Sequence, residues 1–506
     1  MKKHIETLLQ RVSRAFPFLV VETDNYQATL ADISGGLKEE KKGMALLHHD
    51  MARGAVGINE EGAMASGVMN SDKEPALTTA KLEECLQRAL DLLPPKSILV
   101  IDDIHLLLQH RDETVRALYI QCIRNCRDAF KSSNRHLVFL CPKFAANAEI
   151  GNDFEVIVSP PPGDEDRIEI ARGIARSSKI EEPSKEDLSE VSDTLRGLSS
   201  FGVEQLCAAA VSKSGFNINI LRSGSIAAVN ATAGLRVIEN KMTLDQLAGL
   251  EQGKKWGRMK AGGKLCPLAV VLIDEMGDQS AGQGDSNGIN RDARSVQLGA
   301  MQDHEWRGGI FNGVAGTGKT QLAGAIADAC KAMFINWDSG EMKGGIVSDS
   351  ERMIRAAVGT LWNRFGSRVL FIGTTNSMED IAPQMKRRFG TIFFFDVLTE
   401  SQQKPIWDFY MKKFGVTGDL PACSGWTGAE IERCTEIAWE FGIPLTDAAQ
   451  FISPVVASMG DGLDKMRKEA EGKYLSVSYP GYFTTKKTLD IASIRKMAIK
   501  GSSGNN

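Results

Sequence analysis

A short glycine-rich segment near the middle of the chain constrains its fold more than any other feature. The segment consists of Gly313, Val314, Ala315, Gly316, Thr317, Gly318, Lys319 and Thr320. It matches G-x-x-x-x-G-K-[ST] in full, and it lies between an apolar, strand-like stretch at 308–312 and a helical stretch at 319–330. Glycines let backbone N–H groups turn inward around a phosphate, and the helix N-terminus adds partial positive charge. Lys319 is expected to reach the β and γ phosphates of ATP, and Thr320 to hold Mg²⁺.

An acidic strand is the expected partner of this loop. Leu268–Ile273 is wholly apolar, which predicts a strand buried on both faces, and Asp274 and Glu275 follow at its carboxyl end. We expect Asp274 to serve Mg²⁺ and Glu275 to polarise the attacking water. The strand comes about 40 residues before the loop, whereas the usual order is the reverse. Because ligands collect at the carboxyl ends of parallel strands whatever their connections, we predict a sheet connected in an altered order.

Two further polar groups follow the loop. Asn376 ends a predicted strand at 369–373, where its side chain could orient the attacking water, although such a residue is more often part of a turn. Arg387 and Arg388 come about ten residues later, before a predicted strand at 391–397. A basic group is normally a solvated surface feature. Beside a phosphate site it can instead act as an arginine finger on a neighbouring subunit, and Arg388 is the favoured finger.

The first part of the chain has a similar plan but no phosphate loop. It carries predicted strands at 16–21, 97–103 and 136–140, followed by helices at 166–177, 185–195 and 203–212. This pattern is typical of an α/β sheet with a helical lid. The residues after the first strand, 22–25, include no glycine and no lysine, so we expect no ATP hydrolysis here. Asp102-Asp103 is interpreted as a relic structural strand, and His48-His49-Asp50 as an exposed turn rather than a metal site.

Three domains are expected on this basis. They are a degenerate α/β module without a P-loop at 1–235, an ATPase core at 236–400, and a helical lid with a C-terminal extension at 401–506. The stretch 254–264 is basic and contains three glycines, so it is predicted to be a linker or loop. Basic residues lie on both sides of Trp256 in this stretch, a pattern that can also indicate a nucleic-acid-binding surface. A solvated linker is the favoured interpretation.

Charge and composition narrow the cellular setting. Lys plus Arg is 60 and Asp plus Glu is 64, so the whole chain does not carry the positive charge of a typical nucleic-acid binder. The nine cysteines are widely spaced and form no CxxC, which favours reduced thiols in the cytoplasm. No apolar run reaches the roughly 20 residues of a membrane span, and the N-terminal residues lack the apolar core of a signal peptide. We therefore expect a cytoplasmic protein with no membrane association.

Together these motifs resemble the AAA ATPase family over about residues 243–440. Residues 313–320 look like Walker A, 273–275 like Walker B, and 373–376, which end in Asn376, like sensor 1. Three other segments are similar to family features: 243–250 beside the adenine, 341–351 with the central-pore loop, and 426–432 in the lid. The resemblance implies a P-loop core with a parallel sheet and a helical lid, and ATP with Mg²⁺ as its cofactors.

Two finer resemblances concern the rest of the chain. Segments 15–21, 101–103 and 195–198 look like the degenerate first module of a two-module, FtsH-like AAA group. The early Walker B and the extension at 407–483 are similar to AAA proteins carried by bacteriophages, which would place the protein in a host cytoplasm. The pore position holds Ile346-Val347 instead of an aromatic residue, and no HExxH zinc-protease motif is present.

The leading hypothesis is an ATP-hydrolysing AAA machine that remodels a protein or nucleoprotein partner. The resemblance implies a homo-oligomeric ring, with a hexamer favoured, because a finger must enter the site from outside. A nucleotide-gated scaffold without significant turnover and a nucleic-acid motor are the alternatives. Glu275 argues against the scaffold, since a protein that only binds nucleotide can dispense with a water-polarising carboxylate. The substrate is not identified by the sequence.

Overall fold

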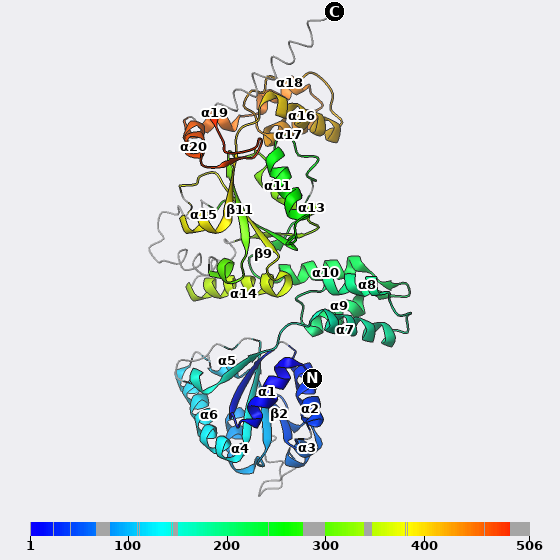
Figure 1. Cartoon of the computed structure of the whole chain (residues 1–506), viewed down its shortest axis with the longest axis vertical. Coiled ribbons are helices and arrows are strands. Elements are labelled where there is room, and N and C mark those ends of the chain that lie inside the picture. The colour runs from blue at the N-terminus through cyan, green and yellow to red at the C-terminus, as the bar shows by residue number, and fades with distance from the viewer. Residues whose placement is uncertain are drawn as a thin grey trace, which may run out of the picture. The chain divides into compact units, whose positions relative to one another are not determined.

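The computed structural model describes residues 2–485 except 24, 41, 67–80, 109, 111, 143, 145–149, 241, 277–298, 339–346, 380, 382 and 460. The chain divides into two compact units, each with its own sheet (Figure 1). The first unit comprises Met1–Ser189 with Leu198–Gly215, and the second comprises Glu190–Gly197 with Phe216–Asn506. Both are built from parallel sheets covered by helices, so the predicted α/β fold class is confirmed.

The sheet of the first unit has six strands in the order β3-β2-β4-β5-β1-β6. All neighbours are parallel except β3, which is antiparallel to β2. The strands are β1 (Phe18–Glu22), β2 (Ala45–Asp50), β3 (Gly54–Gly57), β4 (Ser97–Asp102), β5 (Arg135–Cys141) and β6 (Glu155–Val158). The central strands are buried along nearly their whole length, which explains why their sequences are continuous apolar runs rather than alternating ones.

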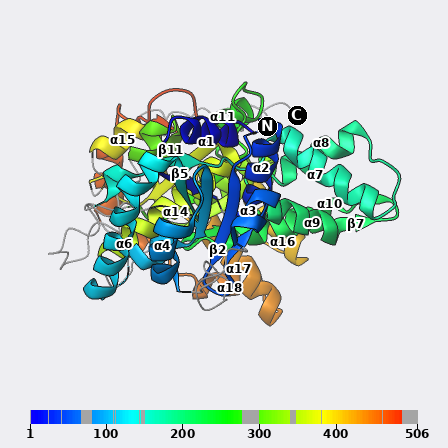
Figure 2. The ribbon, with the colours of Figure 1, turned by 90° about the horizontal axis from the view of Figure 1, so that it is seen from below.

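Helices cover both faces of this sheet (Figures 1 and 2). Helices α1 (Lys3–Ser13) and α2 (Tyr26–Glu39) share one apolar core with the strands, while α4 (Leu82–Leu92), α5 (Ile104–Leu108) and α6 (Glu113–Ser133) share the other. Cys122 and Cys126 of α6 are buried in that second core, as their helical spacing predicts. The remaining elements up to the second sheet are α3 (Glu60–Ser66), η1 (Gly151–Asp153), α7 (Asp164–Ser177), α8 (Lys185–Thr194), α9 (Ser200–Ala210), β7 (Val211–Ser212), β8 (Gly215–Phe216) and α10 (Ile218–Asn230).

The prediction of an exposed turn at His48-His49-Asp50 is wrong. These residues form the carboxyl end of β2, and His48 and His49 are only 4% and 1% exposed. The two imidazoles are buried because β2 is an interior strand covered by β3 on one side and β4 on the other. His48 also has a polar partner there, since its Nε2 lies 2.8 Å from Asp102 Oδ2 at the end of β4.

The second unit contains a seven-stranded sheet in the order β15-β14-β11-β13-β10-β12-β9. The strands are β9 (Leu235–Val237), β10 (Ala269–Ile273), β11 (Arg307–Gly313), β12 (Met333–Trp337), β13 (Val369–Thr375), β14 (Gly390–Phe395) and β15 (Leu475–Ser476). All pairs are parallel except β9 with β12. Strand β10 lies between β12 and β13, although both come later in the chain.

The two sheets share one spatial plan. The first unit's order β2-β4-β5-β1-β6 matches the second unit's order β12-β10-β13-β11-β14, strand for strand. In the first unit, β1 is the first of these five strands in the chain. In the second unit, β10, which occupies the position of β4, comes first and precedes β11, β12, β13 and β14. Both acid-terminated strands therefore occupy the same place in their sheets.

The predicted linker at 254–264 is for the most part a helix, so this prediction is wrong. Helix α11 (Glu251–Ala261) packs on α13 (Lys319–Ala329), and both cover one face of the second sheet. A Cβ on Gly253 or Gly257 would lie 2.5 Å from Leu322 Cδ2 or 2.7 Å from Ile326 Cγ1. The glycines thus permit two helices to approach closely, and they do not indicate a flexible loop.

Helices α14 (Val347–Phe365), α15 (Pro383–Phe389) and α20 (Gly462–Ala470) contribute to the apolar core on the opposite face of the sheet. The lid follows β14 and consists of α16 (Glu400–Phe414), α17 (Gly428–Phe441), α18 (Leu445–Ala448) and η2 (Ala449–Phe451), with α19 (Val455–Met459) leading on to α20 (Figure 1). Its separate apolar core is centred on Trp407 and Trp426.

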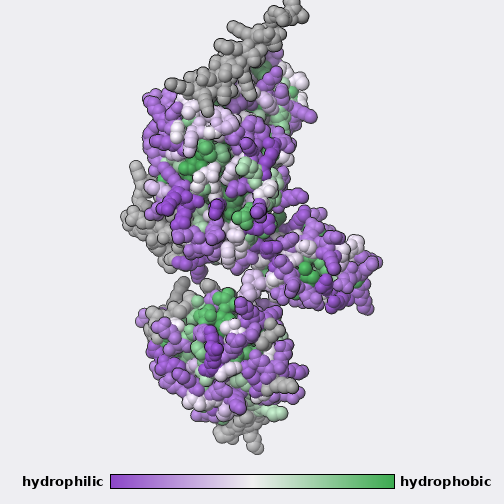
Figure 3. All heavy atoms as spheres, in the orientation of Figure 1, coloured by the Kyte–Doolittle hydropathy of each residue, from purple (hydrophilic) through white to green (hydrophobic). Residues whose placement is uncertain are grey.

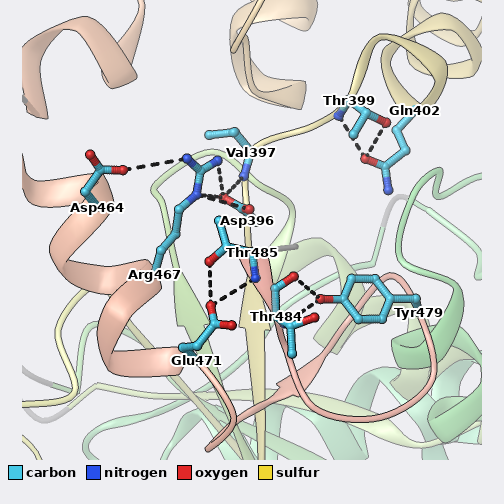
Figure 4. A network of polar contacts seen from close by, with 10 residues as sticks. All are labelled: Asp396, Val397, Thr399, Gln402, Asp464, Arg467, Glu471, Tyr479, Thr484 and Thr485. Carbon is cyan, nitrogen blue, oxygen red and sulfur yellow. Dashed lines mark hydrogen bonds and ion pairs between the residues drawn. The ribbon is translucent and has the colours of Figure 1, made fainter. Parts of the chain in front are cut away.

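The chain after the lid returns to the sheet and is fastened there by polar contacts (Figure 4). Arg467 of α20 lies 3.0 Å from Asp396 Oδ1 at the end of β14. Further on, Thr485 N donates to Glu471 Oε2 at 2.9 Å, and Thr484 N donates to Tyr479 Oη at 2.7 Å. Strand β15 therefore reaches the edge of the sheet from a segment that is anchored on both sides.

Polar and charged residues cover most of the face seen in Figure 3, with small apolar patches between them. Among the described residues, none of the helices combines the length and the hydropathy that a membrane span requires.

Candidate functional site

The glycine-rich loop joins β11 to α13 at the carboxyl edge of the second sheet. Gly313, Gly316 and Gly318 have φ values of +149°, +76° and +90°, a backbone that residues with side chains rarely adopt. Lys319 is the first residue of α13 and is 9% exposed. Its Nζ donates to the carbonyl oxygens of Gly313 at 2.7 Å and Val314 at 3.0 Å. The lysine is therefore held inside the loop that its own backbone forms.

Asn376 is brought to this lysine by the neighbouring strand. The register of β11 with β13 pairs Asn312 with Thr375, so residue 376 emerges beside the loop. Lys319 Nζ donates to Asn376 Oδ1 at 2.8 Å. The structure thus brings together two residues that lie 57 positions apart in the sequence and that the sequence assigns to one site.

The acid pair at the end of β10 is fixed by Thr374. Because Ile273 pairs with Gly373, the next residues, Asp274 and Thr374, face each other across the two strands. The Thr374 hydroxyl donates to Asp274 Oδ1 and accepts from the Glu275 backbone N–H at 3.1 Å. Thr374 lies in the segment that resembles sensor 1, but no role was predicted for it. Extending the parallel register beyond Gly373 places it opposite Asp274. Glu275 has φ +51°, so the chain turns sharply at this position.

Electrostatics link the acid pair to the loop. Burial lowers the pKa of Lys319 to about 8, while the Asp274 and Glu275 carboxylates act in the opposite direction. A buried ammonium that two carboxylates compensate only in part is a site that favours a further anion. With the open glycine backbone and the α13 N-terminus around it, the residues present fit a phosphate group.

The residues that would hold Mg²⁺ also fit that ion. Thr320 is the second residue of α13, and Asp274 ends the acidic strand. The described residues include no group of three or more His, Cys, Asp or Glu side chains placed to bind a metal by themselves. Mg²⁺ keeps several waters and binds through one or two protein groups together with phosphate oxygens, which is the kind of site that Thr320 and Asp274 can provide.

A small cavity of about 30 Å³ lies beside the loop. Its walls come from the segment that leads into α11, from the loop itself and from the lid. They comprise Met242, Gln246, Leu247, Ala248, Leu250, Gly316, Thr317, Gly318, Gln321, Leu398, Ile406, Phe409, Tyr410 and Gly428. The stretch 243–250, whose resemblance implies a place beside the adenine, contributes four of these residues.

The lid contacts the loop directly. Ala429 N, at the start of α17, donates to Gly316 O at 3.3 Å. A Cβ on Gly316 would lie 2.8 Å from Thr427 Oγ1, so only glycine fits without displacing the lid. A change in the loop is therefore transmitted to α17 by contact.

The two arginines lie apart from these groups. Arg387 and Arg388 are exposed on α15, and Arg388 Nη2 donates to Gln302 Oε1. Among the described residues, the hydrogen bonds of Lys319 involve Gly313, Val314 and Asn376, and neither arginine is among its partners. The pore-loop position Ile346 lies outside the described residues.

The corresponding edge of the first unit is closed by its own side chains. Asp103 follows β4 with φ +55°, as Glu275 follows β10. Tyr26 is the first residue of α2, the place that Lys319 takes in α13, and its hydroxyl donates to Asp103 Oδ1 at 2.5 Å. The Asp102 carboxylate is engaged by His48. Tyr26 thus takes the helix position of the lysine, and both acids at the end of β4 are already engaged by side chains of the first unit.

Comparison with known families supports these observations. Residues 2–158 match the family model described as "SpoVK-like AAA ATPase, N-terminal domain". Residues 310–364, which include the phosphate loop, match the model described as "ATPase family associated with various cellular activities (AAA)". The search of curated proteins found no match. The two family matches support an AAA-family ATPase that binds ATP, with an α/β module at its N-terminal end.

Proposed function

We propose that this protein is an ATP-hydrolysing AAA machine with one catalytic site per chain, built on the second sheet. The observation that carries the proposal is the position of Lys319. It is buried, it is bonded to Asn376, and its pKa responds to Asp274 and Glu275. Phosphoryl transfer requires a lysine in the phosphate loop, carboxylates close enough to influence its charge, and a polar side chain at the end of a neighbouring strand. Lys319 has all three around it.

Each group has a distinct role in the proposed reaction. Lys319 and the loop N–H groups would bind the β and γ phosphates. Thr320 and Asp274 would hold Mg²⁺, which would supply positive charge beside those phosphates. Glu275 polarises the attacking water, and Asn376 orients that water once phosphate replaces the amide as the partner of Lys319. Thr374 positions both acids through its hydroxyl.

The altered strand order is part of the proposal. We assign Walker B to β10, ahead of Walker A, in a core spanning about 236–400, between a degenerate FtsH-like module at 1–235 and a lid with extension at 401–506. The support is spatial, because β10 occupies the same place in its sheet as the acid-terminated β4 in the first unit.

Assembly into a homo-oligomeric ring, with a hexamer favoured, follows from the arginines. Arg387 and Arg388 are exposed on α15, where they can reach the site of a neighbouring copy and stabilise transition-state charge. Such a ring would couple ATP turnover to the remodelling of a protein or nucleoprotein partner in the cytoplasm.

The decisive test is Glu275→Gln. We expect ATP turnover to fall at least about 100-fold, since a positioned general base contributes that much or more, while ATP binding persists. Mass measurement of this variant with and without ATP·Mg²⁺ reports assembly in the same experiment. Glu440→Gln on the exposed end of α17 is the matched control and should turn over ATP normally. Unchanged turnover in Glu275→Gln contradicts the catalytic assignment. Binding without turnover in the unaltered protein would favour the scaffold.

A nucleic-acid motor has less support. Lys254 is 7% exposed and donates to Leu247 O at 2.8 Å, and Lys260 lies against the Trp256 ring at 5.2 Å. Trp256 itself packs edge-on against Phe311 and Phe393 in the core. Lys254 and Lys260 are therefore committed to contacts within the fold, whereas Lys255 and Lys264 are exposed. Salt-dependent DNA binding that is lost on neutralising the exposed Lys255 and Lys264 would revive this alternative.

A further inference from the structure

Two thiols meet at the edge of the second sheet that lies opposite the nucleotide site. All nine cysteines are free. The parallel register of β10 with β12 pairs Ala269 with Met333, so the residues three positions earlier, Cys266 and Cys330, lie across from each other. Cys266 Sγ is 3.7 Å from the Cys330 carbonyl oxygen, and burial together with the neighbouring Cys266 thiol raises the pKa of Cys330. We propose that this pair is an oxidative modification site at which a reversible disulfide forms.

The backbone around both cysteines is already fixed. Arg368 Nε donates to Cys266 O at 2.8 Å, and Cys330 N donates to Ile326 O at 3.0 Å as the cap of α13. The two segments are also joined just before the paired strands, where Met333 N donates to Leu268 O at 2.9 Å. Three residues further on, where Ala269 and Met333 begin to pair, neighbouring parallel strands run about 4.8 Å apart, a spacing inside the Cα range of about 4.4–6.8 Å that a disulfide needs. The bond can form without refolding of either segment.

The two thiols differ in their exposure to solvent, and we therefore assign them different roles. Cys266 is partly exposed, whereas Cys330 is 8% exposed. Burial raises the pKa of Cys330 to about 12, and the charge of the nearby Lys260 ammonium opposes this rise. An oxidant from solvent therefore reaches Cys266 first. Lys260 favours the thiolate of Cys330, which is the form that attacks.

The chemistry balances with a peroxide as the oxidant. One molecule of hydrogen peroxide transfers an oxygen to Cys266 Sγ, giving a sulfenic acid and water. Cys330 Sγ then attacks the Cys266 sulfur, the S–S bond forms, and the hydroxyl leaves as a second water with the proton of the Cys330 thiol. The two thiols together lose two electrons, and the peroxide gains them. A dithiol reductant reverses the step by thiol exchange.

The position of the bond gives it a structural consequence. It would join the end of α13, whose first residue is Lys319, to the segment that leads into β10, whose last residues precede Asp274. It also closes a long loop that contains β11 and the phosphate loop. Cross-linking removes conformational entropy from the unfolded chain, so the oxidised protein should unfold at a temperature higher by about 5 °C.

The test treats the full-length protein with hydrogen peroxide, blocks the remaining thiols with iodoacetamide, and maps the cross-link by peptide mass spectrometry. We expect one peptide pair joining Cys266 to Cys330, the rise in unfolding temperature, and recovery of both thiols with dithiothreitol. Neither the cross-link nor the rise should occur in Cys266→Ser or Cys330→Ser. Cys423→Ser removes the other partly exposed thiol and should leave both unchanged.

Lys260→Gln separates an activated pair from two thiols that are merely close. It should slow formation of the cross-link several-fold without preventing it, because it removes the charge that favours the Cys330 thiolate. The proposal is overturned if Cys266 and Cys330 stay reduced under peroxide that modifies Cys423. It is also overturned if Cys266 is oxidised beyond the sulfenic acid while Cys330 remains free. An unchanged rate in Lys260→Gln contradicts the role given to that lysine.

Discussion

At the scale of single residues, Lys319 combines deep burial with a charge. Desolvation lowers its pKa to about 8, below the ordinary lysine value of 10.5. Between these two values the unfolded chain binds a proton that the folded chain does not, so the free energy of unfolding rises with pH through this window. A phosphate beside the ammonium acts in the opposite direction and restores the higher pKa.

Nucleotide binding should therefore take up a proton in mildly alkaline solution. We expect well over half a proton per ADP bound at pH 8.5 and much less at pH 7, where Lys319 is already charged in the free protein. Calorimetry in buffers of different ionisation enthalpy measures this uptake. Lys254→Met alters another buried lysine outside the phosphate loop and should leave the uptake unchanged. Equal uptake at both pH values would contradict the assignment to Lys319.

The residues to which we assign catalysis follow from local sequence more readily than the residue that we propose positions them. The loop glycines, Lys319 and the acids after β10 are adjacent to their own strands, so a short segment identifies them. Thr374 acts through a strand pairing that connects residues 100 positions apart, and short-range patterns carry no information about that pairing. His48 was misjudged for the same reason, because its burial depends on β4 and β3 as neighbours.

At the scale of elements, the end of β14 depends on an ion pair with α20. The Asp396 side chain is 13% exposed and that of Arg467 is 25% exposed, and burial raises the pKa of Asp396 (Figure 4). Removing the guanidinium leaves a carboxylate in a poorly solvated place. Arg467→Met should lower the free energy of unfolding by roughly 2–4 kcal/mol.

The double variant makes that prediction specific. Asp396→Asn together with Arg467→Met should cost less than Arg467→Met alone, because no buried charge is then left unpaired. Urea denaturation of the two single variants and the double variant measures the coupling. Additive losses would show that the pair contributes only packing. Lys465→Met, on the same helix but in an exposed ion pair with Glu379, serves as the control and should change stability little.

Helix α11 illustrates where element prediction from sequence fails. Glycine in a helix interior costs roughly 0.5–1 kcal/mol relative to alanine, so a basic stretch with several glycines favours a loop by local propensity. In the structure Gly253 and Gly257 are the points at which α11 approaches α13, and packing compensates for the lost propensity. The apolar strands were predictable because burial on both faces leaves a continuous pattern in each of them.

At the scale of the whole molecule, two sheets with one plan raise the question of how many nucleotides the chain binds. We expect one per chain, because Tyr26 and His48 occupy the corresponding edge of the first unit. Equilibrium binding of labelled ATP should give a stoichiometry of one, and Lys319→Ala should abolish it. Tyr26→Phe should leave the stoichiometry at one. A second site, or residual binding in Lys319→Ala, would contradict the closed state of the first unit.

The altered order of strands in the second sheet has a consequence during protein synthesis. Strand β10 is wholly apolar, and both of its neighbours, β12 and β13, are translated after it. About a hundred residues separate the end of β10 from the end of β13, which corresponds to roughly 5–20 s of elongation. Strand β12 can pair with β10 about 60 residues after β10 is made, but the other edge of β10 stays without its partner until β13 is complete. During that interval the nascent chain carries a hydrophobic strand with an incomplete sheet around it, a state that favours binding by chaperones at the ribosome.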